Sequence, residues 1–290
     1  MTTLENDLLK VSVRSRGAEL TAVYNKVNQT QHLWQANPAI WAWHAPTLFP
    51  VIGECIDNSI LVNSETYKMG RHGFARNLDF TLLHATSAHA LFCLPFSQGT
   101  LVTYPYKFEF QIAYKLTGNR LSVTYQVINK DDKPIYFSVG GHPAFNVPFS
   151  IKENYADYYL EFTDDTRLTR HLLSESGLFN GKTESVMLKE KKLYLTKDLF
   201  AKDALVFKDL RSRKVSLRST KHNQSISLEF HDFTYLGIWA KPGADFVCIE
   251  PWLGCADTEG KRVDIAEKEA IQKVSTGKSF EATYTIEINS

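Results

Sequence analysis

A long run of alternating apolar and polar residues restricts the fold of this chain more than any other feature. Apolar residues occupy every second position from Phe108 to Leu116 and again from Leu121 to Val127. Between these runs, residues 117–120 (TGNR) have the composition of a tight turn. A period of two is that of a strand with one buried face. This stretch therefore predicts a long antiparallel β-hairpin.

The same period recurs along the rest of the chain, at residues 8–13, 18–25, 158–162, 215–218, 225–230 and 280–288. Helical periodicity is scarce, and residues 265–274 (IAEKEAIQKV) are the only fair helix candidate. No repeat, low-complexity tract or flexible linker divides the chain. With 290 residues, 43% of them hydrophobic, the chain can bury a large core. We expect an all-β fold, one large antiparallel β-sandwich with few short helices, forming a single domain over residues 1–290.

The charge balance excludes several partners. The formal net charge is +1, so no overall field attracts nucleic acid or an acidic membrane surface. The most basic run, residues 211–221, interleaves its charges with Val215 and Leu217 at period two, as a solvated strand face does. No apolar run reaches the roughly 18 residues of a membrane helix. The sequence therefore predicts neither a nucleic-acid partner nor a membrane partner.

The cysteines and the amino terminus bear on the compartment. The four cysteines show no CxxC pair, and charged residues stand in the first thirteen positions, where a signal peptide needs an apolar core. We expect a cytoplasmic protein with reduced thiols, each a small buried side chain.

Three stretches place polar residues among apolar ones, as a ligand site on a β-scaffold does. They are RHGFARNLDF (71–80), VGGHPAFNVP (139–148) and DFVCIEPWLGCAD (245–257). In the first, Arg71, His72 and Arg76 surround a glycine and a phenylalanine.

His142 and Glu250 each precede a proline, which disfavours the α region, so we expect both to be extended at or near a strand end. Gly140 and Gly141 permit unusual dihedral angles or the close approach of a ligand. Glu250 follows the apolar run FVCI and needs a specific partner if it is buried. Trp252 offers an aromatic face on which the apolar C–H groups of a sugar can pack. This combination predicts a carbohydrate site.

Other interpretations of these residues stay open. His142 and His72 can each be structural residues, and we treat the remaining histidines as structural. No HxH or HExxH spacing is present, so the sequence predicts no metal site and no cofactor. A metal site built from His72, His142 and Glu250 remains an alternative.

Blocks along nearly the whole chain resemble the aldose 1-epimerase (mutarotase) family, and its LacX-like branch in particular. In order, these blocks are LWQANPAIWAWHAPTLFPVIG, RHGFARNLDF, GGHPAFNVP, DALVF, SLRS and IEPWLG. The resemblance implies a sandwich of the galactose mutarotase type (a supersandwich) that interconverts the α and β anomers of aldohexoses without a cofactor.

The resemblance also implies roles for individual residues. The acid histidine of the family falls on His142, the basic glutamate on Glu250 and a second active-site histidine on His72. The sugar-binding aspartate falls on Asp203. In related hexose-6-phosphate mutarotases, the arginine of the HGFAR block, here Arg76, helps to bind substrate.

The chain departs from two better-known branches, and these departures concern the substrate. It reads GECIDNS at residues 53–59, where galactose mutarotases carry an arginine, and APTLFP at residues 45–50, where the sugar-phosphate branch has a second arginine. Arg71 replaces that second arginine only if it shares a face with Arg76, and in a strand their odd spacing would point them to opposite faces.

We therefore expect a free aldohexose as substrate, with Arg76 bonding a hydroxyl. A hexose 6-phosphate, a non-catalytic sugar sensor and a glycoside hydrolase are the alternatives. A hydrolase needs two carboxylates across the glycosidic bond, and only Glu250 has a strong local context. The sequence leaves the identity of the sugar and the oligomeric state open.

Overall fold

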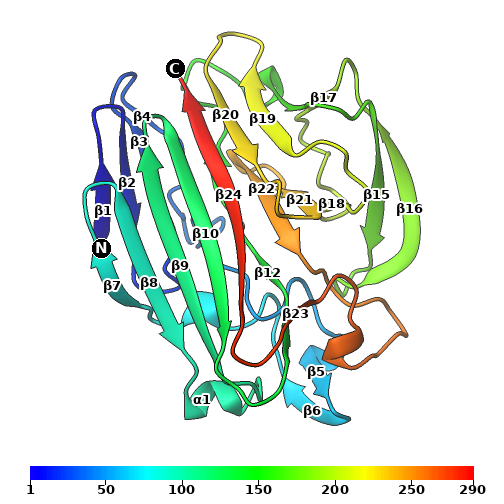
Figure 1. Ribbon diagram of the computed structural model, residues 1–290. Helices are drawn as coiled ribbons and strands as arrows, with labels where there is room; N and C mark the ends of the chain where they lie inside the picture. Colours follow the sequence, from blue (N-terminus) through cyan, green and yellow to red (C-terminus); the bar gives the residue numbers. More distant parts are fainter.

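The computed structural model describes residues 1–290, which form mainly antiparallel β-sheets (Figure 1). The two largest sheets have nine and seven strands. In Figure 1 the nine-stranded sheet crosses the front of the molecule, and β22, β21 and β18 of the seven-stranded sheet lie behind it. The predicted all-β fold of large antiparallel sheets is confirmed. A single domain over residues 1–290 stays a prediction.

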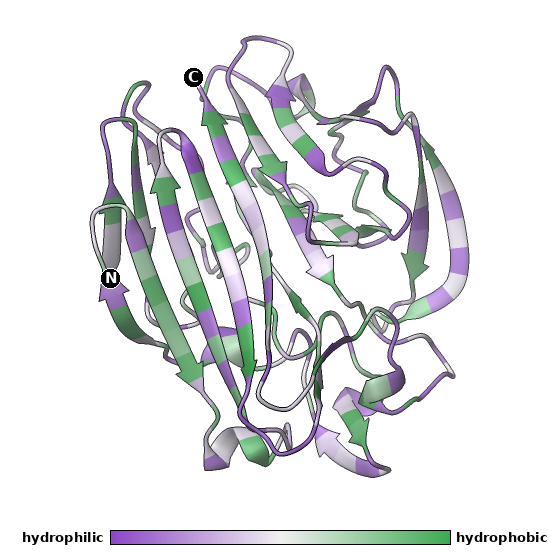
Figure 2. Ribbon diagram, in the orientation of Figure 1, coloured by the Kyte–Doolittle hydropathy of each residue, from purple (hydrophilic) through white to green (hydrophobic).

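The nine-stranded sheet contains the hairpin expected from the alternating run. Thr117 pairs with Arg120 at its turn, where Gly118 has a positive φ of 56°. Buried and less buried residues alternate along both strands, as the bands of hydropathy in Figure 2 show. In sheet order the strands are β17 (Lys192–Tyr194), β14 (Tyr158–Phe162), β19 (Lys214–Ser219), β20 (Ser225–Glu229), β24 (Ser279–Asn289), β10 (Arg120–Asn129), β9 (Phe108–Thr117), β8 (His89–Pro95) and β7 (Thr81–Ala85).

The seven-stranded sheet carries the strand that matters most for the site. Every residue of β22 is buried, so this strand is covered on both faces. In sheet order the strands are β12 (Val139–Gly140), β22 (Phe246–Leu253), β21 (Tyr235–Trp239), β18 (Leu205–Phe207), β15 (Arg167–Leu173) and β16 (Phe179–Met187), and β13 (Ala144–Asn146) also pairs with β22.

Smaller elements complete the fold. The strands of the four-stranded sheet are β1 (Thr2–Glu5), β2 (Leu9–Val13), β3 (Leu20–Asn25) and β4 (Thr30–Gln31). Two further pairs are β5 (Ser59–Val62) with β6 (Glu65–Lys68) and β11 (Ile135–Phe137) with β23 (Gln272–Val274). The helical turns are α1 (Gln98–Leu101) and the 3₁₀ turns Ile56–Asn58, Ala75–Asn77, Tyr155–Asp157 and Ile265–Glu267. None of these helices has the length and apolar character needed to span a membrane.

The helix candidate at residues 265–274 does not form an α-helix. Only Ile265–Glu267 forms a 3₁₀ turn, and Gln272–Val274 forms β23, which pairs with β11. Between them, Ala270 has a left-handed φ of 55°, which a right-handed helix cannot contain. Pairing with a strand distant in sequence has therefore overridden the local helical pattern.

The core fills the space between the sheets. One cluster of 70 buried residues includes aromatic side chains from both large sheets and the loops, among them Phe49, Phe110 and Phe246. All four cysteines are buried and free, which confirms the prediction of small buried thiols.

Candidate active site

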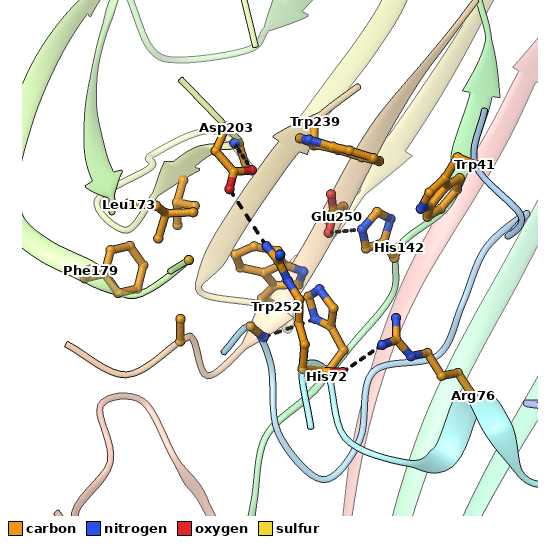
Figure 3. Close-up of a pocket in the computed structure, with 16 residues that line it drawn as sticks. Trp41, His72, Arg76, His142, Leu173, Phe179, Asp203, Trp239, Glu250 and Trp252 are labelled. Carbon is orange, nitrogen blue, oxygen red and sulfur yellow. Dashed lines mark hydrogen bonds and ion pairs between the residues drawn. The ribbon is translucent and has the colours of Figure 1, made fainter. Parts of the chain in front are cut away.

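All seven residues that the sequence singles out line one pocket (Figure 3). Strands of the seven-stranded sheet form one side of this pocket, and the loop residues Gly53 and Arg71 contribute from the other side. The predicted site residues brought together here are Arg71, His72, Arg76, His142, Asp203, Glu250 and Trp252.

Glu250 projects from the interior of β22 and is 2% exposed. We expected it near a strand end, but β22 continues through Pro251 to Leu253. Pro251 has no N–H to donate, but its carbonyl oxygen still accepts a hydrogen bond from the Gly141 N–H at 3.1 Å. A carboxyl group this deeply buried requires a polar partner.

That partner is His142, whose Nε2 atom lies 3.1 Å from Oε2 of Glu250. His142 lies between β12 and β13, both of which pair with β22. The backbone on both sides of His142 is hydrogen-bonded to β22. The Gly141 N–H donates to the Pro251 carbonyl, and the Ile249 N–H donates to the Pro143 carbonyl. The imidazole is therefore held against Glu250 by the sheet itself.

The two glycines before His142, Gly140 and Gly141, lie where neighbouring residues of the protein leave no space for a side chain. Neither has a positive φ. A Cβ atom on Gly140 would lie 2.8 Å from the Pro251 carbonyl oxygen, and one on Gly141 would lie 2.9 Å from the Tyr284 hydroxyl. The close approach expected from the sequence thus comes from Pro251, Trp252 and Tyr284, and neither glycine lines the pocket.

The electrostatics of the His142–Glu250 pair are set by burial. Burial raises the pKa of the Glu250 carboxyl well above its usual range, and the nearby charge of Arg71 opposes this shift. Burial also lowers the pKa of His142 to about 3, and the charges of Arg76 and Arg71 add to this shift. Both shifts disfavour a charged pair in the empty pocket. The two groups therefore hold one proton between them, with the neutral pair favoured.

His72 is fixed as a hydrogen-bond donor. Its Nδ1 atom accepts a hydrogen bond of 3.1 Å from the Gly53 N–H, so in the neutral ring the proton lies on Nε2. Burial and the charges of His142, Arg76 and Arg71 hold the pKa of His72 well below its usual value. The rings of His72 and His142 lie edge to face, with centroids 5.7 Å apart.

Arg71 and Arg76 both line the pocket, which corrects the expectation that they face opposite ways. That expectation assumed a strand, whereas residues 71–77 form a turn that ends in the 3₁₀ helix Ala75–Asn77. The Arg76 guanidinium donates through Nη2 to the Arg71 carbonyl at 2.8 Å and lies 5.3 Å from the centre of the Trp43 ring. The compact turn thus brings both guanidinium groups to the same cavity.

Arg71 already has two acidic neighbours. Its Nε atom lies 3.6 Å from Glu54 and its Nη2 atom 4.0 Å from Asp203. Asp203 has a left-handed φ of 69° and is further fixed by the Ala204 N–H, which donates to Oδ1 at 2.7 Å. The Arg71–Asp203 contact joins two loops across the pocket (Figure 3).

Trp252 forms an aromatic wall of the pocket two residues after Glu250. The indole lies directly over Gly237, where an added Cβ would come within 2.5 Å of the ring. Gly237 of β21 pairs with Glu250, so the absence of a side chain there allows the tryptophan to lie flat beside the carboxyl group.

Sequence reasoning missed nine lining residues, and the largest of these are Trp41, Trp239, Leu173 and Phe179. Trp41 stacks on the His142 ring with centroids 5.1 Å apart, and Trp239 meets it edge-on at 6.0 Å. Leu173 and Phe179 line the part of the pocket beside Asp203 (Figure 3). Trp41 stands inside a block that carried the family resemblance, but no local pattern separates it from Trp34 or Trp43. Leu173 and Phe179 are apolar, and nothing in the sequence distinguishes them from core residues.

The groups best placed to bind a metal differ from the alternative set of His72, His142 and Glu250. Donor atoms of His142, Cys248 and Glu250 lie within 4.8 Å of one another. His72 is not part of this group, and its Nδ1 atom is already engaged by the Gly53 N–H.

Chemically, the pocket combines a proton-sharing pair with a neutral N–H donor, two cations and an aromatic wall. Such a set can bind hydroxyl groups and move a proton between two oxygens of one ligand. Two carboxyl groups line the pocket: Glu250 is paired with His142, and Asp203 lies beside Arg71.

Comparison with known proteins shows the family to which the chain is similar. The model of the family described as aldose 1-epimerase matches residues 1–263. The chain is 31% identical over 294 residues to the plasmid-encoded protein LacX of Lactococcus lactis subsp. lactis, with 98% of both chains covered.

Solved structures show the same fold. A galactose mutarotase related enzyme from Lactobacillus acidophilus superimposes with a TM-score of 0.94 at 35% identity, over 99% of this chain and 97% of that one. A galactose mutarotase-like protein from Lactobacillus casei gives a TM-score of 0.93 at 31% identity over the full length of both chains.

Proposed function

The chain belongs to the aldose 1-epimerase family, and from that premise we propose that it interconverts the α and β anomers of a free aldohexose. The observation that carries this proposal is the buried His142–Glu250 contact of 3.1 Å inside the pocket. No cofactor takes part in the proposed reaction.

Opening the ring of a pyranose requires two proton transfers. The anomeric hydroxyl loses a proton while the ring oxygen gains one, and both oxygens are bound to the same carbon. The acid and the base must therefore be near neighbours, as Nε2 of His142 and Oε2 of Glu250 are. In our proposal Glu250 takes the hydroxyl proton and His142 protonates the ring oxygen.

Sugar binding prepares the pair for this task. In the empty pocket burial favours the neutral pair, with the shared proton on Glu250. An anomeric hydroxyl that donates to Glu250 stabilises the carboxylate, and a ring oxygen that accepts from His142 stabilises the imidazolium. The substrate itself thus shifts the proton to His142. After rotation about the C1–C2 bond of the open chain, the reverse transfers close the ring from the other face.

The surrounding residues bind and orient the sugar in this scheme. The Nε2–H of His72 donates to an oxygen near the anomeric carbon, and Trp252 packs against C–H groups of the ring. Arg76 and Asp203 bind hydroxyl groups farther from the reacting centre. These contacts hold the sugar so that both oxygens meet the proton-sharing pair.

The charge balance of the pocket favours a neutral sugar. Arg71 lies beside Glu54 and Asp203, so its charge is compensated within the protein. Arg76 is then the remaining cation, whereas a phosphate monoester carries close to two negative charges. A hexose 6-phosphate remains the second candidate, because both arginines line the same cavity.

Proton NMR of freshly dissolved α-glucose, α-galactose and α-glucose 6-phosphate, with and without the protein, tests the proposal. We expect faster appearance of the β-anomer signal for at least one free hexose. Binding of a sugar without acceleration would instead identify a sensor, and faster reaction only with the phosphate would reassign the substrate.

A further inference from the structure

A third side chain with metal-binding chemistry lies beside the proton-sharing pair. Cys248 is completely buried and stands two residues before Glu250 in β22, so their side chains lie on the same face of the strand. Its thiol sulfur, Nε2 or Nδ1 of His142 and a carboxylate oxygen of Glu250 all lie within 4.8 Å of one another. The proposed reaction makes no use of this thiol.

The sheet holds these three donors in place. Cys248 and Glu250 are fixed by β22, which is paired with β21 over residues 248–252. His142 follows β12 and precedes β13, and β13 pairs Ala144 directly with Cys248. The cluster is therefore part of the rigid sheet and not of a flexible loop.

The donor set matches the preference of zinc and related ions. Thiolate, imidazole and carboxylate are the usual zinc ligands in proteins, and their bond lengths place two ligands of one tetrahedral ion about 3 to 4 Å apart. The His142–Glu250 separation of 3.1 Å already fits this spacing. His142 and Glu250 face the pocket, which gives an ion a path of entry and leaves its fourth position open to a water molecule.

We propose that His142, Cys248 and Glu250 form a site for a thiophilic divalent ion such as zinc, and that the ion excludes the sugar from the acid–base pair. Coordination releases the thiol proton and the proton that His142 and Glu250 share. An ion at this position occupies the acid and the base together, so it inhibits the reaction. The inhibitory part of this inference rests on the proposed function, whereas the binding part does not.

Metal binding is measured first, without any assay of activity. Apo-protein is titrated with Co²⁺, because a thiolate bound to cobalt gives a charge-transfer band in the near ultraviolet, and Zn²⁺ is then added to displace it. We expect one ion per chain and a band that Zn²⁺ removes. Absence of tight Co²⁺ and Zn²⁺ binding by the wild-type protein would overturn the proposal.

Two cysteine variants locate the site. Cys248→Ala removes the proposed ligand, and Cys93→Ala removes a buried thiol of β8 in the nine-stranded sheet. We expect Cys248→Ala to lose the band and to bind Co²⁺ at least tenfold more weakly, with Cys93→Ala unchanged. Circular dichroism and thermal unfolding check that both variants fold. Should Cys248→Ala be unfolded, Cys248→Ser, which keeps the size of the side chain but cannot supply a thiolate, replaces it. A band retained in the folded variant rejects the assignment.

The activity arm separates the two proposals. Zn²⁺ is expected to slow anomer exchange by wild-type protein and by Cys93→Ala, with recovery after addition of a chelator and protection by excess sugar. A cobalt band in a protein without mutarotase activity would support the metal site and reject the proposed function. Zinc-insensitive mutarotase activity without a band would do the reverse.

Discussion

Nε2 of His142 lies 3.1 Å from Oε2 of Glu250, and the two residues are 7% and 2% exposed. At this distance and burial neither group titrates independently, so the two groups share one proton and titrate as a coupled pair. Its protonation is set by desolvation and by whatever ligand contacts the pair. In the proposed reaction the sugar is both the substrate of the pair and the factor that decides which member carries the proton.

Replacing Glu250 with glutamine should remove most of the activity while keeping the fold. The amide is nearly isosteric, but it cannot take the proton of the anomeric hydroxyl. We expect a loss of about 10²-fold or more in turnover, measured by polarimetry or NMR. Glu259→Gln, at an exposed position outside the pocket, is the matched control. Turnover within a few-fold of wild type would exclude Glu250 as the base.

Replacing His142 with asparagine should lower kcat more than it raises KM. Protonation of the ring oxygen matters chiefly in the transition state, so its loss acts mainly on turnover. Steady-state kinetics with α-glucose or α-galactose measure both parameters. A higher KM with unchanged kcat would make His142 a binding residue and reject its role as the acid.

The pH profile follows from the shared proton. The pair gains a second proton only when His142 titrates, at a pKa of about 3, and loses its one proton only above the raised pKa of Glu250. We therefore expect kcat/KM, which reports the free enzyme, to show no loss in acid until the pH approaches the pKa of His142, and to fall on the alkaline side as Glu250 ionises. A loss of kcat/KM as the pH falls through about 6.5, the value of an ordinary imidazole, would contradict the shared-proton description.

Stability should decrease in acid because of a histidine outside the site. His32 is completely buried, neither ring nitrogen has a hydrogen-bond partner, and burial lowers its pKa from 6.5 to about 4. Between these values the unfolded chain takes up a proton that the folded protein excludes, so the free energy of unfolding falls as the pH falls below 6.5. The full effect of one such group is about 3 kcal/mol.

His32→Phe provides the measurement, since the ring packs edge-to-face on Phe149 with centroids 5.1 Å apart and a phenyl ring keeps this contact. Urea unfolding of both proteins at a series of pH values gives the difference. The variant should lose less stability between about pH 7 and 4 than wild type. Parallel curves would show that the pKa of His32 is the same in the folded and unfolded states, which contradicts the lowered value.

The sequence predicted those parts of the molecule that depend on local patterns. The period of two located β9, β10 and β24, because one face of each strand packs on the core. The helix over residues 265–274 failed because β23 is stabilised by pairing with β11, which is far away in the sequence. Local periodicity contains no information about such a partner.

The same distinction applies to the site. His142 and Glu250 were recognisable because a polar residue among apolar ones needs a local reason, and the family resemblance added the rest. Gly140 and Gly141 were misinterpreted because their close neighbours, Pro251 and Tyr284, come from other parts of the chain. Leu173 and Phe179 look like any core residue, and only the tertiary fold places them at the pocket.

We expect the substrate class to depend on how the pocket compensates the charge of Arg71. Glu54 and Asp203 lie within 4.0 Å of its guanidinium, so a phosphate has to compete with two carboxylates for this cation. Arg76, held by the Arg71 carbonyl and placed over Trp43, is one cation against the nearly two charges of a phosphate. We therefore expect kcat/KM for glucose to equal or exceed that for glucose 6-phosphate, and Arg76→Ala to raise KM for the free sugar. Parallel kinetics on both sugars decide the question: a tenfold or greater preference for the phosphate, abolished by Arg76→Ala, would show that Arg76 binds the phosphate despite the acidic neighbours of Arg71.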